Sequence, residues 1–321
     1  MGTIRNDRVD LFFESFDSAC MALYEDIKIN YLDALIRVGN DIVFQVDDSK
    51  ISEETYNKIL GIYKDLVNVS FTNEEIRMAL ELLIVKAFKH ANLSLDILTP
   101  DVINYFLTMI IEMKFSGRKK ISILDTLLGT ANSLQAISNN LSVKSELIGI
   151  EKEDYLIKLA QVSSNLQNNE MKIYYFDALN QIDDLVDVVI GDLNNCSYEV
   201  EKCENSYLFE KGVKYFPYLL IEKRLDNIVD DGYFMFVIDN DFFKAENNQI
   251  FKEFLNERVT LMALIVLPQS LVREGCVGKS ILIGKKAVLD NYHMSILNIE
   301  RFEKDYMKDM MFRIKELVKD I

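Results

Sequence analysis

The sequence ISILDTLLGTANSL fills residues 121–134 and decides the fold class. Its first four residues are a short apolar run with two β-branched isoleucines, which favours a buried strand. Asp125 and Gly129 follow at once, and glycine permits the tight turn that joins a strand to a helix. In open α/β sheets, a turn at the carboxyl end of the first strand is where nucleotide-like ligands bind. The stretch therefore predicts an α/β protein with a ligand site at this turn.

Six further apolar runs follow along the chain and alternate with helical segments. Continuous runs of Ile, Val and Leu separated by helices are typical of a mostly parallel sheet that is covered on both faces. The segment between the last two runs is too short for a crossover helix, so we expect these two strands to pair antiparallel. The predicted strands are Ile121–Leu124, Glu146–Ile150, Lys172–Phe176, Asp187–Ile190, Tyr233–Ile238, Met262–Leu267 and Ser280–Lys285.

The region before this sheet has a helical pattern. Apolar residues recur there at three- and four-residue spacing, and we expect helices at Lys28–Val38, Glu53–Asn68 and Asn73–His90. The last of these is predicted to begin with a capping box, in which Thr72 is the N-cap and Glu75 stands three residues later. A short strand is expected at Asp41–Val46. These patterns predict a helical N-terminal domain over residues 1–97 and an α/β domain over residues 98–321.

The composition is that of a globular protein with an acidic balance. Of the 321 residues, 49% are hydrophobic, and 36 Lys and Arg stand against 51 Asp and Glu, which gives a net charge of −15. Both parts are acidic, with 10 basic and 17 acidic residues up to Leu98 and 26 and 34 after it. Tight binding to naked nucleic acid needs clustered Lys and Arg, and the cluster at Arg118–Lys120 is small. Direct binding to DNA is therefore expected to be weak.

Cysteine, histidine and hydropathy patterns limit the class of protein further. The four cysteines have no CxxC spacing and only two histidines are present, so a zinc or other metal site is not expected. No apolar stretch approaches the ~20 residues that a membrane span needs. The N-terminus lacks the basic region and apolar core of a signal peptide. We therefore expect a cytoplasmic protein with reduced thiols and no membrane association.

Acidic residues follow the second and third predicted strands as well. Glu151 is placed to accept hydrogen bonds from both hydroxyls of a ribose, and Asp177 is placed to accept one from an adenine amino group. Each of them alone fits a solvated loop equally well. In series with the turn at Gly129, they predict a nucleoside-type ligand. The GxGxxG pattern of dinucleotide binding is absent, because Ala131 stands where a second glycine is expected.

The order of these residues resembles that of the N6-adenine DNA methyltransferases, class I enzymes that use S-adenosylmethionine (SAM). Over Leu98–Lys286 the chain is most similar to the standalone methylase-like proteins of the YtxK type, which are related to the modification subunits of type I restriction systems. The resemblance implies a seven-stranded, Rossmann-like methyltransferase sheet with an antiparallel last strand, and SAM as the cofactor. It also implies cofactor-binding residues: Thr99, Asp125, Gly129, Thr130, Asn132, Glu151, Asp177 and Asp192.

The catalytic motif departs from the family. There, the fourth strand ends in Asp or Asn, two prolines and an aromatic residue. The oxygens of this motif accept the hydrogens of a poorly nucleophilic amine, and the aromatic ring stacks on the flipped base. This chain has Asp192-Leu193-Asn194-Asn195, which keeps the acceptor at Asp192 and a carbonyl at Leu193. The missing ring is expected from Tyr198, in the long segment after the strand. The alternatives are that Asp192 only ends the strand and that the segment contains a helix with core aromatics.

The leading hypothesis is a SAM-dependent methyltransferase with a degenerate catalytic motif. Its catalytic residues would be Asp192 and Tyr198, and its methyl acceptor is left open. One alternative is a non-catalytic module that binds SAM or a protein partner. Another is a methyltransferase that acts on protein, RNA or a small molecule, which the acidic charge suits better. We expect the chain alone to methylate duplex DNA poorly unless a protein partner brings the DNA.

Overall fold

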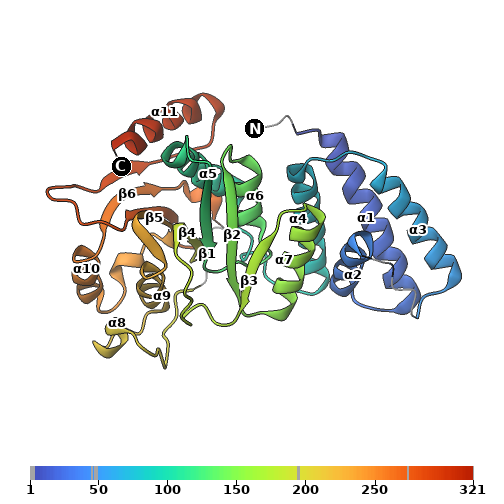
Figure 1. Cartoon of the computed structure of the whole chain (residues 1–321), viewed down its shortest axis with the longest axis horizontal. Coiled ribbons are helices and arrows are strands. Elements are labelled where there is room, and N and C mark those ends of the chain that lie inside the picture. The colour runs from blue at the N-terminus through green and yellow to red at the C-terminus, as the bar shows by residue number, and fades with distance from the viewer. Residues whose placement is uncertain (1–3, 45, 47–49, 194–195, 273–274, 321) are drawn as a thin grey trace. The chain divides into compact units, whose positions relative to one another are not determined.

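The computed structural model describes residues 4–44, 46, 50–193, 196–272 and 275–320, and the chain divides into two compact units (Figure 1). The domain boundary predicted at residue 97 stays a prediction, because packing shows which segments touch and not which segments fold alone. The first unit comprises Met1–Thr99, Gly129–Asn140 and Glu153–Met171. The second comprises Pro100–Leu128, Leu141–Lys152 and Lys172–Ile321.

Six helices make up the described part of the first unit. Their N-terminal ends follow the local sequence, because Asn30 and Ser52 accept hydrogen bonds from backbone N–H groups of the first turn. The predicted capping box of Thr72 and Glu75 is confirmed, with both of its hydrogen bonds present. The helices are α1 (Asn6–Ile27), α2 (Tyr31–Val43), α3 (Glu53–Val67), α4 (Asn73–His90), α6 (Asn132–Asn140) and α7 (Asp154–Leu166).

The strand predicted at Asp41–Val46 is wrong over its described residues, because α2 continues to Val43. The side chain of Asp41 is buried there, 3.4 Å from the hydroxyl of Tyr63 and 3.9 Å from the guanidinium of Arg37 one turn earlier. Helical i,i+4 spacing makes this second contact. These helix contacts outweigh the weak strand preference of two adjacent β-branched residues.

The core of the first unit joins the N-terminal helices to α7. Phe16 of α1, Leu35 of α2 and Leu83 of α4 are fully buried in one cluster, which also contains Leu156 and Leu159 of α7. Burying an apolar side chain of this size contributes about 1.5–3 kcal/mol. Helix α7 therefore packs as a member of the helical unit, although it follows a strand of the sheet in the sequence.

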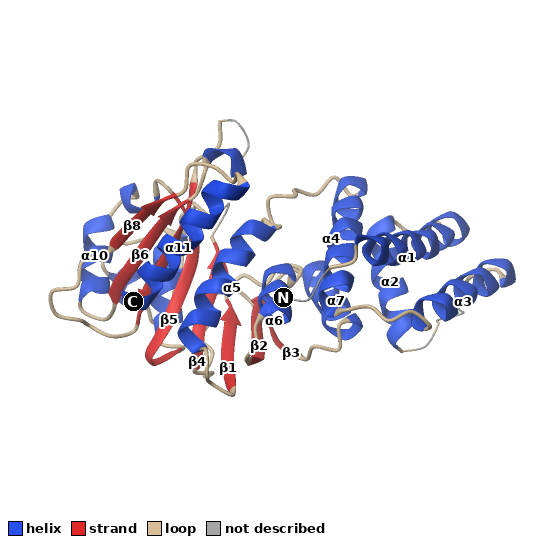
Figure 2. Cartoon of the chain, turned by 90° about the horizontal axis from the view of Figure 1, so that it is seen from above, coloured by secondary structure: helices blue, strands red, loops and turns tan. Residues whose placement is uncertain are grey.

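The second unit contains a mixed sheet, in which the described residues form eight strands in the order β3-β2-β1-β4-β5-β7-β6-β8 (Figure 2). Strand β1 pairs parallel with β2 and β4, and β4 pairs parallel with β5. The predicted reversal is confirmed, because β7 pairs antiparallel with both β5 and β6. The strands are β1 (Lys120–Asp125), β2 (Lys144–Glu151), β3 (Met171–Tyr175), β4 (Val186–Asp192), β5 (Ile228–Asp239), β6 (Thr260–Val266), β7 (Lys279–Lys285) and β8 (Ser295–Asn298).

Helices of the second unit cover both faces of the sheet. Phe234 and Phe236 of β5 lie in one core cluster with residues of α9 and α10. Tyr233 points to the opposite face because side chains alternate along a strand, and its ring meets Phe115 of α5 edge to face at 5.9 Å. These helices are α5 (Asp101–Phe115), α9 (Phe216–Leu225) and α10 (Asn248–Asn256), and the unit also contains α8 (Tyr207–Glu210) and α11 (Lys304–Asp320).

Candidate functional site

A row of acidic residues lies at the carboxyl edge of the sheet. Asp125, Glu151 and Asp192 are the last residues of β1, β2 and β4, three strands that are neighbours in the sheet. Asp177 comes shortly after β3, the next strand beyond β2. Because parallel strands end at the same edge, the structure brings together the four carboxylates that the sequence analysis singled out in this unit. This edge is where open α/β sheets bind ligands.

Asp125 is the most perturbed member of the row. Its side chain is buried, and its Oδ1 accepts one hydrogen bond, at 3.1 Å, from the backbone N–H of Leu127. The pKa of this carboxyl is raised to about 7, mainly by burial; the Leu127 N–H lowers it, and the nearby carboxylates of Asp192 and Glu151 contribute to the rise. A buried carboxylate is costly unless a cation or several donors compensate it. Such an arrangement is typical of a binding or catalytic site.

Two glycines let the turn after β1 approach the neighbouring strands. A Cβ atom at Gly149 of β2 would lie 2.6 Å from the side chain of Leu128, and one at Gly191 of β4 would lie 2.4 Å from Oγ1 of Thr126. The backbone N–H of Thr126 donates to the carbonyl of Ile190 at 3.0 Å. The turn is therefore held against β4 and β2. The sequence analysis missed both glycines, although each stands just before an acidic strand end.

The rest of the predicted turn belongs to the first unit. Gly129 and Ala131 both have positive φ angles, 56° and 63°, so the position with alanine also adopts the left-handed conformation that glycine prefers. Thr130 and Asn132 are buried. The Oδ1 of Asn132 accepts a hydrogen bond from the guanidinium of Arg77 at 2.7 Å. Sequence reasoning could not find Arg77, because 55 residues separate it from Asn132.

Thr99 is the remaining predicted cofactor residue. It is buried and belongs to the first unit. Pro100 follows it as the residue that precedes α5. Thr99 therefore lies just before the helix that leads to β1 and not within it, and its role in binding stays a prediction.

Glu151 and Asp177 both interact with Lys152. Lys152 donates its backbone N–H to Glu151 Oε1 at 2.8 Å, and its ammonium lies 3.5 Å from Asp177 Oδ2. The other oxygen of Asp177 accepts the backbone N–H of Leu179 at 2.9 Å. This hydrogen bond fixes the carboxylate beside the end of β3. Both predicted acceptors are thus close to a common lysine.

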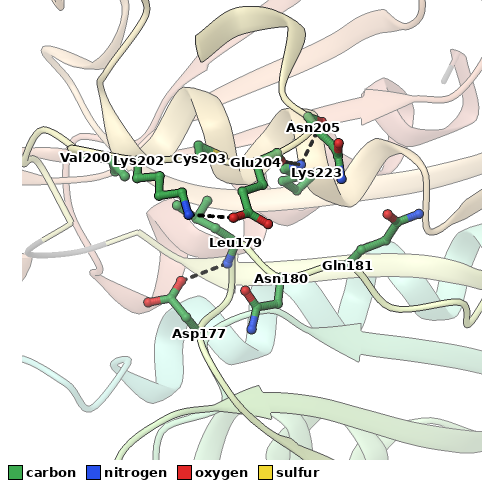
Figure 3. A pocket seen from close by; sticks show the side chains of 10 residues that line it. All are labelled: Asp177, Leu179, Asn180, Gln181, Val200, Lys202, Cys203, Glu204, Asn205 and Lys223. Atoms are coloured by element: carbon green, nitrogen blue, oxygen red, sulfur yellow. Dashed lines mark hydrogen bonds and ion pairs between the residues drawn. The ribbon is translucent and has the colours of Figure 1, made fainter. Parts of the chain in front are cut away.

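A pocket of about 490 Å³ opens beside Asp177 (Figure 3). Ligand pockets of this size are common. Figure 3 shows two lysines whose charges are already engaged. Lys202 forms an ion pair with Glu204 at 2.6 Å, and Lys223 donates to the backbone carbonyl of Asn205 at 2.8 Å. Asp177 belongs both to the acidic row and to the lining of this pocket. The pocket is lined by Asp177, Leu179, Asn180, Gln181, Val200, Lys202, Cys203, Glu204, Asn205 and Lys223.

The predicted catalytic residues lie at the end of β4 and in the segment after it. Asp192 ends the strand, and the next residue, Leu193, is buried and donates its N–H to the carbonyl of Val237 at 2.9 Å. The Leu193 carbonyl already accepts the N–H of Cys196 at 3.2 Å. The departures from the family motif at Asn194 and Asn195 lie outside the described residues. The predicted second acceptor is therefore partly occupied by the chain itself.

Tyr198 is half-exposed and has one ring face covered. Its ring stacks on that of Phe216 with the centroids 4.8 Å apart and an angle of 24° between the planes. The pKa of the Tyr198 hydroxyl is raised to about 12, mainly by burial and also by the thiol of Cys196 and the carboxylate of Asp177. The phenol therefore stays protonated at neutral pH. The predicted role of Tyr198 as a ring that stacks on the acceptor stays a prediction.

The rest of the segment after β4 is partly helical, as one alternative predicted. The short helix α8 buries Leu208, and the ring of Tyr207 stacks on that of Phe254 in α10 with the centroids 6.0 Å apart. Burial, with help from Asp192, raises the pKa of the Cys196 thiol to about 12. A thiol with so high a pKa is a poor nucleophile.

The described residues contain no helix with the length and apolar character needed to cross a membrane. Within the same part of the chain, no group of three or more His, Cys, Asp or Glu side chains is arranged to hold a metal ion.

Comparisons with known proteins agree with the predicted resemblance. Residues 10–88 match the family model of the YtxK N-terminal helical domain. The protein YtxK of Bacillus subtilis (strain 168) is 28% identical over 274 residues, which are 84% of this chain and 83% of YtxK. Helices α1 to α4 thus carry a similarity that the sequence analysis assigned mainly to the region after Leu98.

Solved structures show the same relationship. The crystal structure of a candidate class I SAM-dependent methyltransferase from Listeria monocytogenes is 28% identical and covers 98% of this chain and 100% of that one, with a TM-score of 0.84. The methyltransferase subunit of a type I restriction-modification system from Streptococcus thermophilus is 15% identical and covers 96% of this chain and 74% of that one, with a TM-score of 0.62. This second likeness concerns the fold alone. The chain thus combines a YtxK-like N-terminal helical domain with the fold of the class I SAM-dependent methyltransferases.

Proposed function

We propose that the chain binds SAM at the carboxyl edge of β1, β2 and β4 and transfers its methyl group to an acceptor held at Asp192. The buried carboxyl of Asp125 carries this proposal. Its surroundings in the second unit raise its pKa, and the charged groups that act on it there are the carboxylates of Asp192 and Glu151. A ligand with positive charge would supply the missing compensation. SAM has two positive groups, an ammonium and a sulfonium.

The residues present fit this cofactor in three further respects. Glu151 ends β2 as an acceptor for ribose hydroxyls, and Asp177 has a carboxylate oxygen within reach of a pocket beside β3. Gly149 allows the close packing of the turn after β1. Asn132 has a buried Nδ2 atom without a hydrogen-bond partner in the described structure. The proposed cofactor-binding residues are Thr99, Asp125, Gly129, Thr130, Asn132, Glu151, Asp177 and Asp192.

SAM supplies an electrophilic methyl group when it is bound. The contribution of this chain to transfer would be to orient the acceptor, since positioning provides much of the catalysis in such a reaction. The carboxylate of Asp192 would accept a hydrogen from the attacking amine, and the ring of Tyr198 would cover the acceptor with the face that Phe216 leaves free. The Leu193 carbonyl has one lone pair left for a second hydrogen.

The methyl acceptor is proposed to be something other than free duplex DNA. The net charge of −15 repels a phosphate backbone, and flipping a base costs a few kcal/mol that phosphate contacts normally offset. A protein or small-molecule acceptor, or DNA presented by a partner subunit, avoids this difficulty, and a single-stranded RNA acceptor avoids the cost of flipping a paired base. The unpaired state of the cysteines suits the cytoplasm, where we place the protein.

A second candidate function is a SAM-binding module without transfer activity. The contact between the Leu193 carbonyl and the Cys196 N–H favours it, because this contact uses part of the second acceptor of the motif. Such a module would keep the acidic row for SAM and would act through a protein partner.

Transfer of a tritiated methyl group separates these functions. The intact chain is incubated with labelled SAM in three separate reactions. One contains mixed genomic DNA at low salt, one contains RNA, and one contains a protein extract. We expect little label in DNA and incorporation into one of the other acceptors, which Asp192→Ala abolishes and Asp192→Asn partly retains. Strong labelling of DNA that Asp192→Ala abolishes would contradict the proposed acceptor. Binding of SAM without transfer to any acceptor would favour the module.

A further inference from the structure

A buried arginine of the N-terminal helices contacts the turn that follows β1. Arg77 of α4 is 2% exposed, and its Nη1 donates to Oδ1 of Asn132, the first residue of α6, at 2.7 Å. The same guanidinium forms ion pairs with Glu74 at 2.8 Å and with Glu81 at 3.1 Å. Its charge is therefore compensated within α4. The bond to Asn132 is additional, and it joins two segments that are far apart in the sequence.

This bond decides which way the Asn132 amide faces. A guanidinium has only donors, so it must meet the amide oxygen and not the amide nitrogen. The nitrogen, Nδ2, is consequently turned away from Arg77. It is buried and has no hydrogen-bond partner in the described part of the chain. A buried donor without a partner is unfavourable and calls for an acceptor from outside the chain.

We infer that Arg77 is a positioning residue, which holds Asn132 so that its Nδ2 donates to the α-carboxylate of SAM. The inference rests on the proposed function. The α-carboxylate is the strongest hydrogen-bond acceptor that SAM offers to a buried N–H donor such as this one. Asn132 also opens α6, and the N-terminus of a helix favours a negative group. Arg77, which lies in the segment that matches the YtxK N-terminal helical domain, thus acts on the amino-acid end of the cofactor indirectly, through Asn132.

Two variants separate positioning from a general effect on folding. Asn132→Asp keeps an oxygen for Arg77 and has nearly the same shape, but it replaces the Nδ2 donor by a second acceptor. Arg77→Gln introduces an amide that is both donor and acceptor and no longer fixes the orientation of Asn132. Arg5→Gln is the matched control. It removes an arginine that pairs at 2.7 Å with Glu75 on the same helix and that does not contact Asn132.

The experiment measures binding of two ligands to the intact chain by titration calorimetry. S-adenosylhomocysteine keeps the amino acid of SAM, whereas 5′-methylthioadenosine lacks it. We expect Asn132→Asp to weaken the binding of S-adenosylhomocysteine by roughly tenfold or more, the usual effect of losing a hydrogen bond to a charged group. Arg77→Gln should weaken the binding of the same ligand several-fold. Binding of 5′-methylthioadenosine should stay unchanged in both variants, and Arg5→Gln should bind both ligands as the unmodified chain does.

Each contrary result has a distinct meaning. If Asn132→Asp weakened the binding of both ligands equally, Asn132 would have a merely structural role, and the inference would be overturned. Unchanged binding of S-adenosylhomocysteine in both variants would overturn it too, while the proposed function would stand. If the unmodified chain binds neither ligand, the proposed function fails and the inference fails with it.

Discussion

The replacement Asp125→Asn should stabilise the chain at neutral pH and make its stability less dependent on pH. In the folded chain, burial raises the pKa of the Asp125 carboxyl from its ordinary value of 3.8 to about 7. Between these two pH values the folded state holds a proton that the unfolded state has lost. The free energy of unfolding therefore falls as pH rises through this window, and it falls no further above it. The amide of Asn has no proton to lose there.

The size of the effect follows from the pKa shift. A shift of one unit is worth about 1.4 kcal/mol, so the stability difference between Asp125→Asn and the unmodified chain should grow by about 4 kcal/mol from pH 4 to pH 8. The amide oxygen of Asn can still accept the N–H of Leu127, so this hydrogen bond is kept. The stabilising replacement should at the same time weaken SAM binding, because the ligand loses its counter-charge.

Urea unfolding at pH 4 to 8 measures this difference in the free energy of unfolding. The unfolding is followed by circular dichroism, because the chain contains no tryptophan. Asp241→Asn is a suitable control, since Asp241 is exposed and pairs with Lys244 at the surface. The control should keep the pH profile of the unmodified chain. Parallel profiles for Asp125→Asn and the unmodified chain would refute the reasoning, because they would mean that this carboxyl has the same pKa in the folded and the unfolded chain.

Three further predictions concern packing, backbone and thiols. Deletion of residues 1–95 should expose Leu156 and Leu159 and lower solubility, as size-exclusion chromatography would show; a soluble, monomeric remainder would contradict this. Ala131→Gly should raise the free energy of unfolding by about 0.5–1 kcal/mol, because φ is 63° there; a loss of stability in urea would refute it. The exposed Cys276 should react with a thiol reagent well before Cys196, and mass spectrometry of partly labelled protein would reveal the opposite order.

Most of the predicted strands could be found from the sequence because they are apolar runs that the sheet buries; β3, Met171–Tyr175, is an exception with no buried residue. Strand β8, Ser295–Asn298, lacks this signal, since it is an edge strand whose side chains are mostly exposed. Thr72 and Glu75 were found because a capping box is a purely local pattern. The strand expected at Asp41–Val46 failed because a tertiary partner, Tyr63, favours the helical position of Asp41.

The acidic residues of the candidate site were predictable for a similar reason. They stand at the ends of predicted strands, and a parallel sheet brings the ends of its strands to one edge. Asp125, Glu151 and Asp192 could therefore be predicted to lie near one another from the sequence alone. The pKa of Asp125 could not be predicted, because it depends on burial by residues from several strands. Arg77 could not be predicted either. Its contact with Asn132 joins α4 to α6 and has no counterpart in local spacing.

The central claim, that SAM binds along the acidic row, is tested most directly by titrating SAM into the intact chain in a calorimeter. Glu151→Ala is compared with Glu146→Ala, a control on the same strand whose exposed carboxylate pairs with Lys120 at 2.6 Å. We predict measurable binding that Glu151→Ala weakens by about 1–3 kcal/mol, the cost of leaving hydroxyl groups unpaired, and that Glu146→Ala leaves unchanged. No detectable heat with millimolar SAM, or equal affinity in Glu151→Ala and the unmodified chain, would contradict the claim.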